Sequence, residues 1–234
     1  MQTVSYSFYK SAKKLTDISY EPHFIQFSDK LTGYGYNLDK VSDRIILFFG
    51  GSEFIAYNSV AVYSGGFDCP FISADYYGTQ ESKGKMNLKT MQKTAVEMYD
   101  WAKTEYPQCK IIIMGHSYGT GIAAYLASVR EAECLFLAAG YRDISDLYNK
   151  IIPIFYGPFK IFISNNIPVS EYADNVSCPV YIIGSDSDAT LDSSLQKKVS
   201  ECFENSEMKI FNGISHADYY VNDDVIDYIK NKMK

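Results

Sequence analysis

The pentapeptide at residues 115–119, Gly-His-Ser-Tyr-Gly, constrains the fold more than any other part of the 234-residue chain. It follows the apolar run 111–114 and precedes a helix-compatible stretch that begins at Thr120. A sharp turn between a strand and a helix strains its central residue, and the flanking glycines leave room for that turn. The sequence therefore predicts a strand, a tight turn that presents the hydroxyl of Ser117, and a helix whose N-terminal N–H groups face it.

Apolar and amphipathic segments alternate along most of the chain. Continuous apolar runs, typical of strands covered on both faces, lie at residues 44–49, 71–76, 111–114, 134–139, 179–183 and 208–211. The clearest helical patterns span 88–105 and 220–233. Two shorter segments, 23–27 and 34–38, are joined by a turn at 29–33 and predict an antiparallel hairpin. We therefore expect an α/β fold with a mostly parallel sheet, an N-terminal hairpin and helices on both faces.

Composition and charge argue against several classes of function. The formal net charge is −6 and the pI is near 5.1, whereas a nucleic-acid partner calls for a basic face. The five cysteines form no C-x-x-C pair, so neither a zinc site nor a redox dithiol is indicated, and reduced thiols suit a cytoplasmic protein. No stretch approaches ~18 uninterrupted apolar residues, and the N-terminus lacks a secretory signal. We expect no membrane span, no metal and no organic cofactor.

Nothing in the sequence divides it, since it contains no linker, repeat or low-complexity tract. We expect one domain over residues 1–234 with an insertion at about 143–176, where a simple crossover would need far fewer residues. The centre of this interval, 151–163, is apolar but is interrupted by two prolines and Lys160. It predicts a small cap over the strand ends rather than a membrane anchor.

A serine hydroxyl becomes a good nucleophile when a base takes its proton and a carboxylate orients that base. The chain has three histidines. His23 lies in the first predicted strand, and His116 adjoins Ser117, so its side chain points away from the hydroxyl. His216 lies in the loop between the last strand and the last helix, which belongs at the same sheet edge as Ser117. We predict His216 as the base.

The acid is expected in the loop after the 179–183 strand. Asp188 is the favoured candidate because it lies where this loop turns back towards the loop of His216. Asp186 is nearer the strand end and is better suited to stabilising the loop. Asp143, which follows the preceding strand, is a third candidate.

A reacting carbonyl needs preformed N–H donors for the oxyanion that it becomes. One donor is predicted at Tyr118, the residue after the nucleophile. The second is predicted in the loop after the first long apolar run, where Gly50 and Gly51 let the backbone approach closely. Ser52 is the first choice for this donor and Glu53 the second. An ordinary strand-end turn is the alternative interpretation of the two glycines.

With these residues in place, the chain resembles the α/β-hydrolase family along nearly its whole length. The chain order of Ser117, Asp188 and His216 matches the family order of nucleophile, acid and base. The chain is most similar to the small-cap branch of serine-aminopeptidase-like, monoglyceride-lipase-like and acyl-protein-thioesterase-like enzymes. The similarity rests on the segments 75–84 (D-Y-R-G-x-G-x-S-x-G in that branch), 115–121, 125–128 and 178–183. Gly50 replaces the histidine of the usual H-G pair, Tyr77 replaces the loop arginine, and the H-G-x-x-D motif before the acid carries two substitutions.

The resemblance implies a serine hydrolase that cleaves an ester or thioester of a small acyl-type substrate through an acyl-enzyme at Ser117. A peptidase or amidase of the same fold is a less favoured alternative, and an inactive hydrolase-like binding protein is another. A dinucleotide-dependent oxidoreductase is the third class, because residues 119–124 satisfy G-x-G-x-x-A. That fingerprint requires its first glycine at the strand end and an acidic residue at the end of the next strand, and neither requirement is met here.

Overall fold

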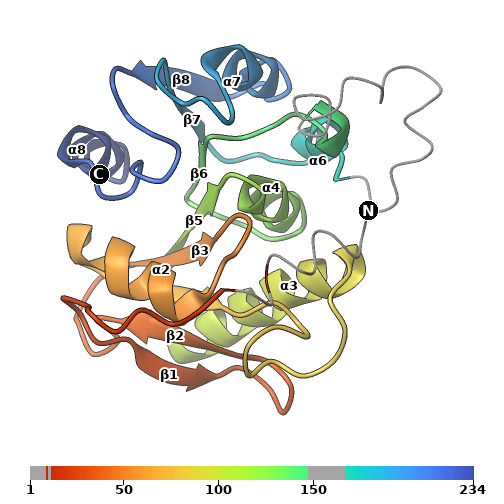
Figure 1. The fold of residues 1–234 in the computed structure, drawn as a ribbon. Helices are drawn as coiled ribbons and strands as arrows, with labels where there is room; N and C mark the ends of the chain where they lie inside the picture. The colour runs from red at the N-terminus through yellow and green to blue at the C-terminus, as the bar shows by residue number, and fades with distance from the viewer. Residues whose placement is uncertain (1–8, 10–11, 147–166) are drawn as a thin grey trace.

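The computed structural model describes residues 9, 12–146 and 167–234. One eight-stranded sheet runs through them in the order β1-β2-β4-β3-β5-β6-β7-β8 (Figure 1). The strands are β1 (His23–Gln26), β2 (Thr32–Tyr36), β3 (Arg44–Phe49), β4 (Phe71–Ala74), β5 (Lys110–His116), β6 (Cys134–Ala138), β7 (Val180–Ser185) and β8 (Ser206–Phe211). The β1–β2 and β2–β4 pairs are antiparallel and the other neighbours are parallel, which confirms the predicted fold class.

Helices cover both faces of the sheet, as the sequence predicts. They are α2 (Ala56–Tyr63), α3 (Leu88–Glu105), α4 (Gly119–Val129), α6 (Val169–Ala173), α7 (Ser193–Ser200) and α8 (Asp223–Lys232), with the short 3-10 turn η1 (Ser64–Gly66) after α2. In Figure 1, α2 and α8 lie on one face of the sheet, and α3, α4, α6 and α7 lie on the other. Within the described residues, no helix combines the length and apolar character needed to cross a membrane.

The boundary of β2 differs from the prediction. The strand begins at Thr32 instead of residue 34, so Gly33 belongs to the sheet and not to the turn. A Cβ on Gly33 would lie 2.2 Å from the carbonyl oxygen of Ser73 in β4, and glycine therefore permits the two strands to meet here. The turn closes earlier, where the N–H of Phe27 donates to the carbonyl of Leu31 at 2.9 Å.

The start of α8 also differs from the prediction. The helix begins at Asp223, three residues later than expected, because the side chain of Asn222 accepts a hydrogen bond from the N–H of Val225 at 3.2 Å and caps it. The preceding Tyr219 and Tyr220 lie outside the helix and are fully buried. Because the helix starts later, both tyrosines lie in the loop that carries His216.

The central strands form the most deeply buried part of the described chain. Every residue of β6 is buried, as are five of the six residues of β3. Each large apolar side chain that is fully buried contributes about 1.5–3 kcal/mol, so these strands resist local opening. The loops that follow these strands therefore start from rigid carboxyl ends.

The predicted insertion at 143–176 falls only partly within the described residues, and its apolar centre, 151–163, lies outside them. At its two ends, Asp143 and Pro168 form an isolated antiparallel bridge. Ile167 is fully buried, and α6 packs against α4. The described ends of the insertion are thus fixed to the helical face that carries α4.

Candidate active site

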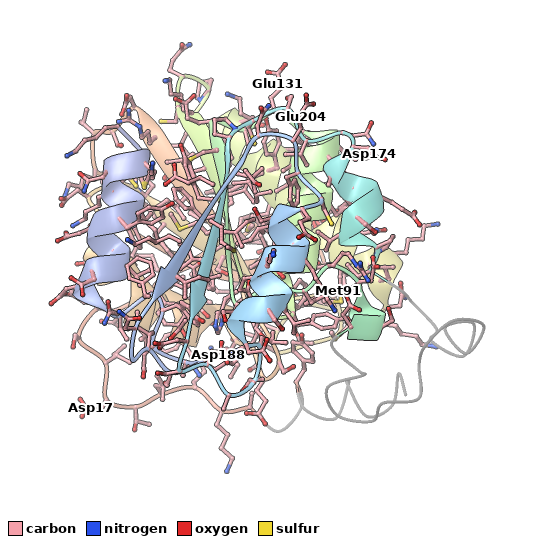
Figure 2. The ribbon with its side chains drawn as sticks, turned by 90° about the horizontal axis from the view of Figure 1, so that it is seen from above. Asp17, Met91, Glu131, Asp174, Asp188 and Glu204 are labelled. Carbon is pink, nitrogen blue, oxygen red and sulfur yellow. The ribbon has the colours of Figure 1, made fainter. Side chains whose placement is uncertain are left out.

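Three loops meet beyond the carboxyl ends of the parallel strands. They follow β5, β7 and β8, and they carry Ser117, Asp188 and His216. Figure 2 shows Asp188 at the opposite end of the molecule from Glu131 and Glu204, which precede β6 and β8. Open α/β sheets bind their ligands outside the carboxyl ends of the strands, so the predicted site residues lie at the edge where chemistry is expected.

Ser117 lies on the sharp turn that the pentapeptide predicts, between β5 and α4. Its φ of 52° is in the left-handed region, which is strained for a residue with a side chain. The turn is held on both sides: the N–H of Ser117 donates to the carbonyl of Ala138 at 2.9 Å, and the Thr120 hydroxyl donates to the carbonyl of Ser117 at 2.6 Å. These bonds fix the backbone of Ser117 at the end of the buried strand.

The glycines of the pentapeptide are required because the backbone has no room for a side chain there. A Cβ on Gly119 would lie 2.2 Å from the carbonyl oxygen of Phe49, and one on Gly115 would lie 2.7 Å from the Cα of Thr120. The start of α4 is therefore pressed against the end of β3 and against its own strand. Side chains at these two positions would push the helix away and displace the serine.

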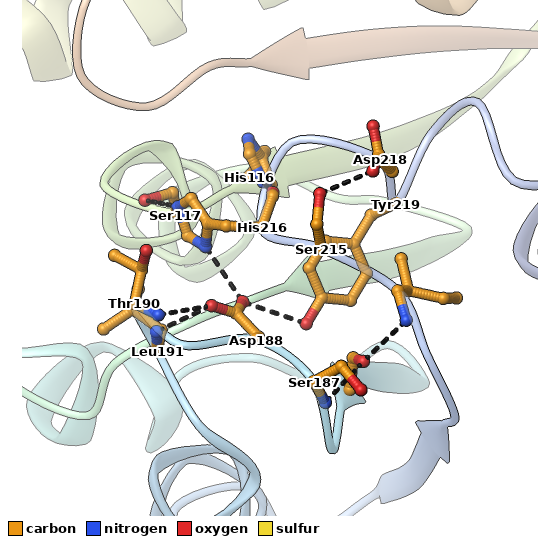
Figure 3. A network of polar contacts seen from close by, with 12 residues as sticks. His116, Ser117, Ser187, Asp188, Thr190, Leu191, Ser215, His216, Asp218 and Tyr219 are labelled. Atoms are coloured by element: carbon orange, nitrogen blue, oxygen red, sulfur yellow. Dashed lines mark hydrogen bonds and ion pairs between the residues drawn. The ribbon is translucent and has the colours of Figure 1, made fainter.

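A continuous chain of hydrogen bonds links the three predicted residues (Figure 3). Ser117 Oγ lies 3.0 Å from His216 Nε2, and His216 Nδ1 lies 2.9 Å from Asp188 Oδ2. A carboxylate oxygen only accepts, so Nδ1 carries the proton and the lone pair of Nε2 faces the hydroxyl. The arrangement can move a proton from the serine to the imidazole.

Asp188 is held as an anion by an unusually complete set of donors. Its Oδ1 accepts from the N–H groups of Thr190 and Leu191 at 2.8 and 2.9 Å, and its Oδ2 accepts from His216 Nδ1 and, at 3.0 Å, from the hydroxyl of Tyr219. Burial acts to raise the pKa of Asp188, but the hydrogen bonds from His216 and the two backbone donors outweigh it, and the pKa is lowered. The carboxylate can therefore stabilise positive charge on His216.

The two other acid candidates serve different contacts. Asp186 Oδ1 accepts from the N–H of Gly213 at 2.9 Å and from the hydroxyl of Ser187, so it ties the loop after β7 to the loop after β8. Asp143 accepts from the hydroxyl of Ser170 at 2.8 Å, near the start of α6. Only Asp188 of the three is hydrogen-bonded to His216.

His116 contacts the loop of His216, a contact that the sequence analysis did not anticipate. Its Nε2 lies 2.8 Å from the carbonyl oxygen of His216, and the two rings are 5.0 Å apart between centroids. Burial, followed by the nearby charge of His216, lowers the pKa of His116 to about 4, so this imidazole is neutral and donates from Nε2. His116 therefore fixes the backbone of the candidate base from the strand that carries Ser117.

The loop after β3 approaches the serine from the other side. Gly51 is buried, and a Cβ there would lie 2.9 Å from the Cβ of Ser117 and 3.3 Å from its Oγ. Ser52 and Glu53 follow at the surface, and Glu53 has a φ of 61°. The structure thus brings the segment chosen for the second oxyanion donor beside the nucleophile, while Tyr118 is the N-cap residue of α4.

A buried carboxyl holds this loop in place. Asp75, directly after β4, accepts from the N–H of Ala56 at 2.8 Å at the start of α2. Burial raises the pKa of Asp75 to about 7, although this hydrogen bond opposes the shift. Asp75 lies in a segment that the family resemblance already includes, but its role as the anchor of the loop after β3 depends on a contact over 19 residues that a sequence pattern does not contain.

Tyr219 is the residue near the site that sequence reasoning missed. It is fully buried, and its hydroxyl contacts Asp188. The predicted helix at 220–233 placed its neighbour on a helix, and no pattern distinguishes one inward tyrosine among 21. The described residues contain no cluster of three or more histidine, cysteine or acidic side chains suited to holding a metal ion.

Comparisons with known proteins agree with this architecture. A family model described as alpha/beta hydrolase fold matches residues 52–140. Similar curated proteins include lysophosphatidylserine lipase ABHD12 of Danio rerio, 28% identical over 146 residues, and that of Xenopus tropicalis, 30% identical over 144 residues. Each match covers 55% of this chain but only 38% and 37%, respectively, of the relative's length.

Solved structures extend the likeness to nearly the whole chain. The esterase Pf2001 of Pyrococcus furiosus superposes with a TM-score of 0.70 at 15% identity and covers 95% of both chains. Est1E of Butyrivibrio proteoclasticus with bound ferulic acid gives a TM-score of 0.66 at 16% identity and covers 90% of this chain and 99% of its own. At such identities the likeness is one of fold.

Proposed function

Because the chain belongs to the α/β-hydrolase superfamily, we propose that it is a serine hydrolase that cleaves an ester or thioester of a small acyl-type substrate. Ser117 is the proposed nucleophile, His216 the base and Asp188 the acid. The observation that carries the proposal is the unbroken hydrogen-bond chain from Ser117 Oγ through the imidazole to Asp188. Among the histidines of the sequence, His216 is the one bonded to both a hydroxyl and a carboxylate.

The proposed reaction has two steps. In the first, Ser117 Oγ attacks the substrate carbonyl while His216 Nε2 takes the hydroxyl proton, and the imidazolium then protonates the departing alcohol or thiol. In the second, water attacks the acyl-enzyme while His216 takes a proton from it, and the imidazolium then returns this proton to Ser117 Oγ as the carboxylic acid product leaves. Asp188 stays ionised throughout, as its lowered pKa favours.

The oxyanion of each step is assigned to two backbone N–H groups. Tyr118 N–H is proposed as the donor at the start of α4, where the helix dipole also favours negative charge. Ser52 N–H is proposed as the second donor, because it follows Gly51 on the segment packed against Ser117. The backbone supplies both donors, so replacement of the Ser52 side chain should leave the oxyanion site largely intact.

An ester is the favoured substrate class. The relatives are named as lipases for lysophosphatidylserine and the structural neighbours include an esterase and a protein with bound ferulic acid, so acyl and aromatic acyl esters are the first to test. A peptidase or amidase with the same residues is the second candidate within the fold. An inactive binding protein is disfavoured by the intact chain of hydrogen bonds.

The experiment is a panel of acyl esters, acyl thioesters and acyl amides of graded chain length, assayed with the wild type and with Ser117→Ala. We expect turnover of esters or thioesters that Ser117→Ala abolishes at unchanged fold, as judged by circular dichroism. Turnover of amides alone would replace the esterase by the peptidase. Binding of acyl compounds without any turnover would favour the inactive binding protein.

A further inference from the structure

Tyr219 forms a fourth link in the candidate site. Its ring is fully buried, and its hydroxyl lies 3.0 Å from Asp188 Oδ2 (Figure 3). The same oxygen accepts from His216 Nδ1 at 2.9 Å. Tyr219 and His216 thus share one carboxylate oxygen, while the other oxygen is occupied by backbone N–H groups.

The loop places this hydroxyl with little freedom. Asn222 delays the start of α8, and the N–H groups of Val221 and Asn222 both donate to the carbonyl of Asp218, so the chain turns at this point. The two tyrosines of the turn are anchored at different places. Tyr219 reaches Asp188, and the hydroxyl of Tyr220 donates to the carbonyl of Gly115 at 2.9 Å.

The hydroxyl of Tyr219 can act only as a donor to this carboxylate. Burial, and then the charge of Asp188, raises the pKa of Tyr219 far above its ordinary value, so the phenol keeps its proton at neutral pH. A donor on Oδ2 takes up part of the negative charge that would otherwise act on the neighbouring imidazole. Charge-assisted hydrogen bonds are about twice as strong as neutral ones, so the bond from Tyr219 has a sizeable effect on the charge of the Asp188 carboxylate.

We propose that Tyr219 is a positioning residue that limits the basicity of the Asp188–His216 pair. By drawing charge from Oδ2, its hydroxyl weakens the hold of the pair on a proton. The imidazole of His216 is then more readily available to accept the proton of Ser117. The inference rests on the proposed function, since it assigns a role within that same site.

The effect of the Tyr219 hydroxyl on His216 can be measured only if the other titratable groups that face His216 stay unchanged. From β5, His116 faces it and is neutral. From the loop after β7, Asp188 is bonded to its ring, and within its own loop Asp218 accepts from Ser215. A change of Tyr219 to phenylalanine alters none of these groups and removes one oxygen atom.

The experiment compares Tyr219→Phe with Tyr220→Phe, two adjacent buried tyrosines that each lose one hydrogen bond. Because the chain has only three histidines, their imidazole signals can be assigned in nitrogen-15 spectra with His23→Gln and His116→Gln. We expect Tyr219→Phe to move the titration midpoint of the His216 imidazole upwards by about 0.5–1 pH unit. The acid limb of kcat/KM should move by the same amount. Tyr220→Phe should move neither, although it should lower the melting temperature to a similar extent.

An equal displacement in both variants, or none in Tyr219→Phe, would overturn the inference, because a purely structural tyrosine affects stability and not the midpoint. If Tyr219→Phe does not fold, 4-fluorophenylalanine at 219 fills the space without a donor, and 4-aminophenylalanine restores a donor and should restore the midpoint. The spectra do not need turnover. If Tyr219→Phe displaces the midpoint relative to the wild type but the wild type hydrolyses none of the substrates, the proposed function is rejected and the inference stands.

Discussion

Two buried aspartates lie at the same edge of the sheet and differ in charge. Asp75 follows β4 and Asp188 follows β7, and they are 1% and 2% exposed. Asp188 accepts four hydrogen bonds, and its pKa is lowered. Among the described residues, Asp75 accepts one hydrogen bond, from the N–H of Ala56, and its Oδ2 has no partner; its pKa is raised to about 7. Both side chains are nearly closed to solvent, but burial acts more strongly on Asp75 and fewer donors oppose it there, so the pKa of Asp75 is raised and that of Asp188 is lowered.

The difference separates two tasks on the two sides of Ser117. On the side of β7 and β8, a permanent anion faces the imidazole and supports the charge that it gains during proton transfer. On the side of β3 and β4, the carboxyl of Asp75, with its raised pKa, ties the start of α2 to the end of β4 and holds the loop of Gly51 against the serine. One aspartate acts through its charge, and the other acts through one hydrogen bond.

Asp188→Asn should give the largest effect, a loss of about 10³–10⁴-fold in kcat. An asparagine presents a neutral acceptor or a donor to His216 Nδ1, so it no longer stabilises the imidazolium and no longer fixes the tautomer. Steady-state kinetics at pH 7 to 9 measure the loss. If Asp188→Asn keeps most of the wild-type rate at unchanged fold, Asp188 is not the acid and the comparison with Asp75 fails.

His116→Phe should give an intermediate effect, a fall of roughly 3- to 10-fold in kcat/KM, which corresponds to one hydrogen bond of about 1 kcal/mol. Phenylalanine keeps a ring in place but leaves the carbonyl of His216 without its donor. His116→Gln can still donate and should lose less. Equal losses in the two variants would mean that the ring packing matters and the hydrogen bond does not.

His116 should also make the protein less stable as the pH falls. An unfolded histidine titrates near 6.5, and the folded pKa of His116 is about 4. Between these values the unfolded chain binds more protons, so stability is lost as the pH falls from about 6.5 to 4. Thermal melts of the wild type and His116→Phe across this range should show a smaller loss in the variant. Parallel curves would contradict the neutral state assigned to His116.

Asp75→Asn should give the smallest change in rate, less than about threefold, because the amide oxygen can still accept from Ala56 N–H. Its effect on stability has the opposite pH dependence. An unfolded aspartate titrates near 3.9 and the folded pKa of Asp75 is about 7, so the folded state binds more protons in this window and stability falls as the pH rises through it. In melts from pH 4 to 8, the variant should gain stability over the wild type as the pH rises. A constant difference between the two would show that Asp75 is ionised throughout.

The elements of the fold could be predicted because their signals are local. The buried strands are continuous apolar runs, and the pentapeptide gave the turn at Ser117 together with its strand and helix. The start of β2 could not be predicted, because Gly33 is required by its contact with β4, which lies about 40 residues along the chain.

The candidate site shows the same division. The roles of Ser117, His216 and Asp188 could be predicted from the number of histidines and from the loops in which the three residues lie. Three contacts could not be predicted: that of Tyr219 with Asp188, that of His116 with the carbonyl of His216, and that of Asp75 with Ala56. Each of these contacts depends on the direction of one buried side chain across 19 to 100 residues of sequence, and periodicity carries no such information.

The most direct test of the central claim is the mass of the intact protein after treatment with a fluorophosphonate, followed by identification of the modified peptide. We predict one adduct per chain, on Ser117, with labelling abolished by Ser117→Ala and strongly slowed by His216→Ala. A folded wild type that takes up no adduct, or takes it up on another residue, would contradict the claim that His216 and Asp188 activate Ser117.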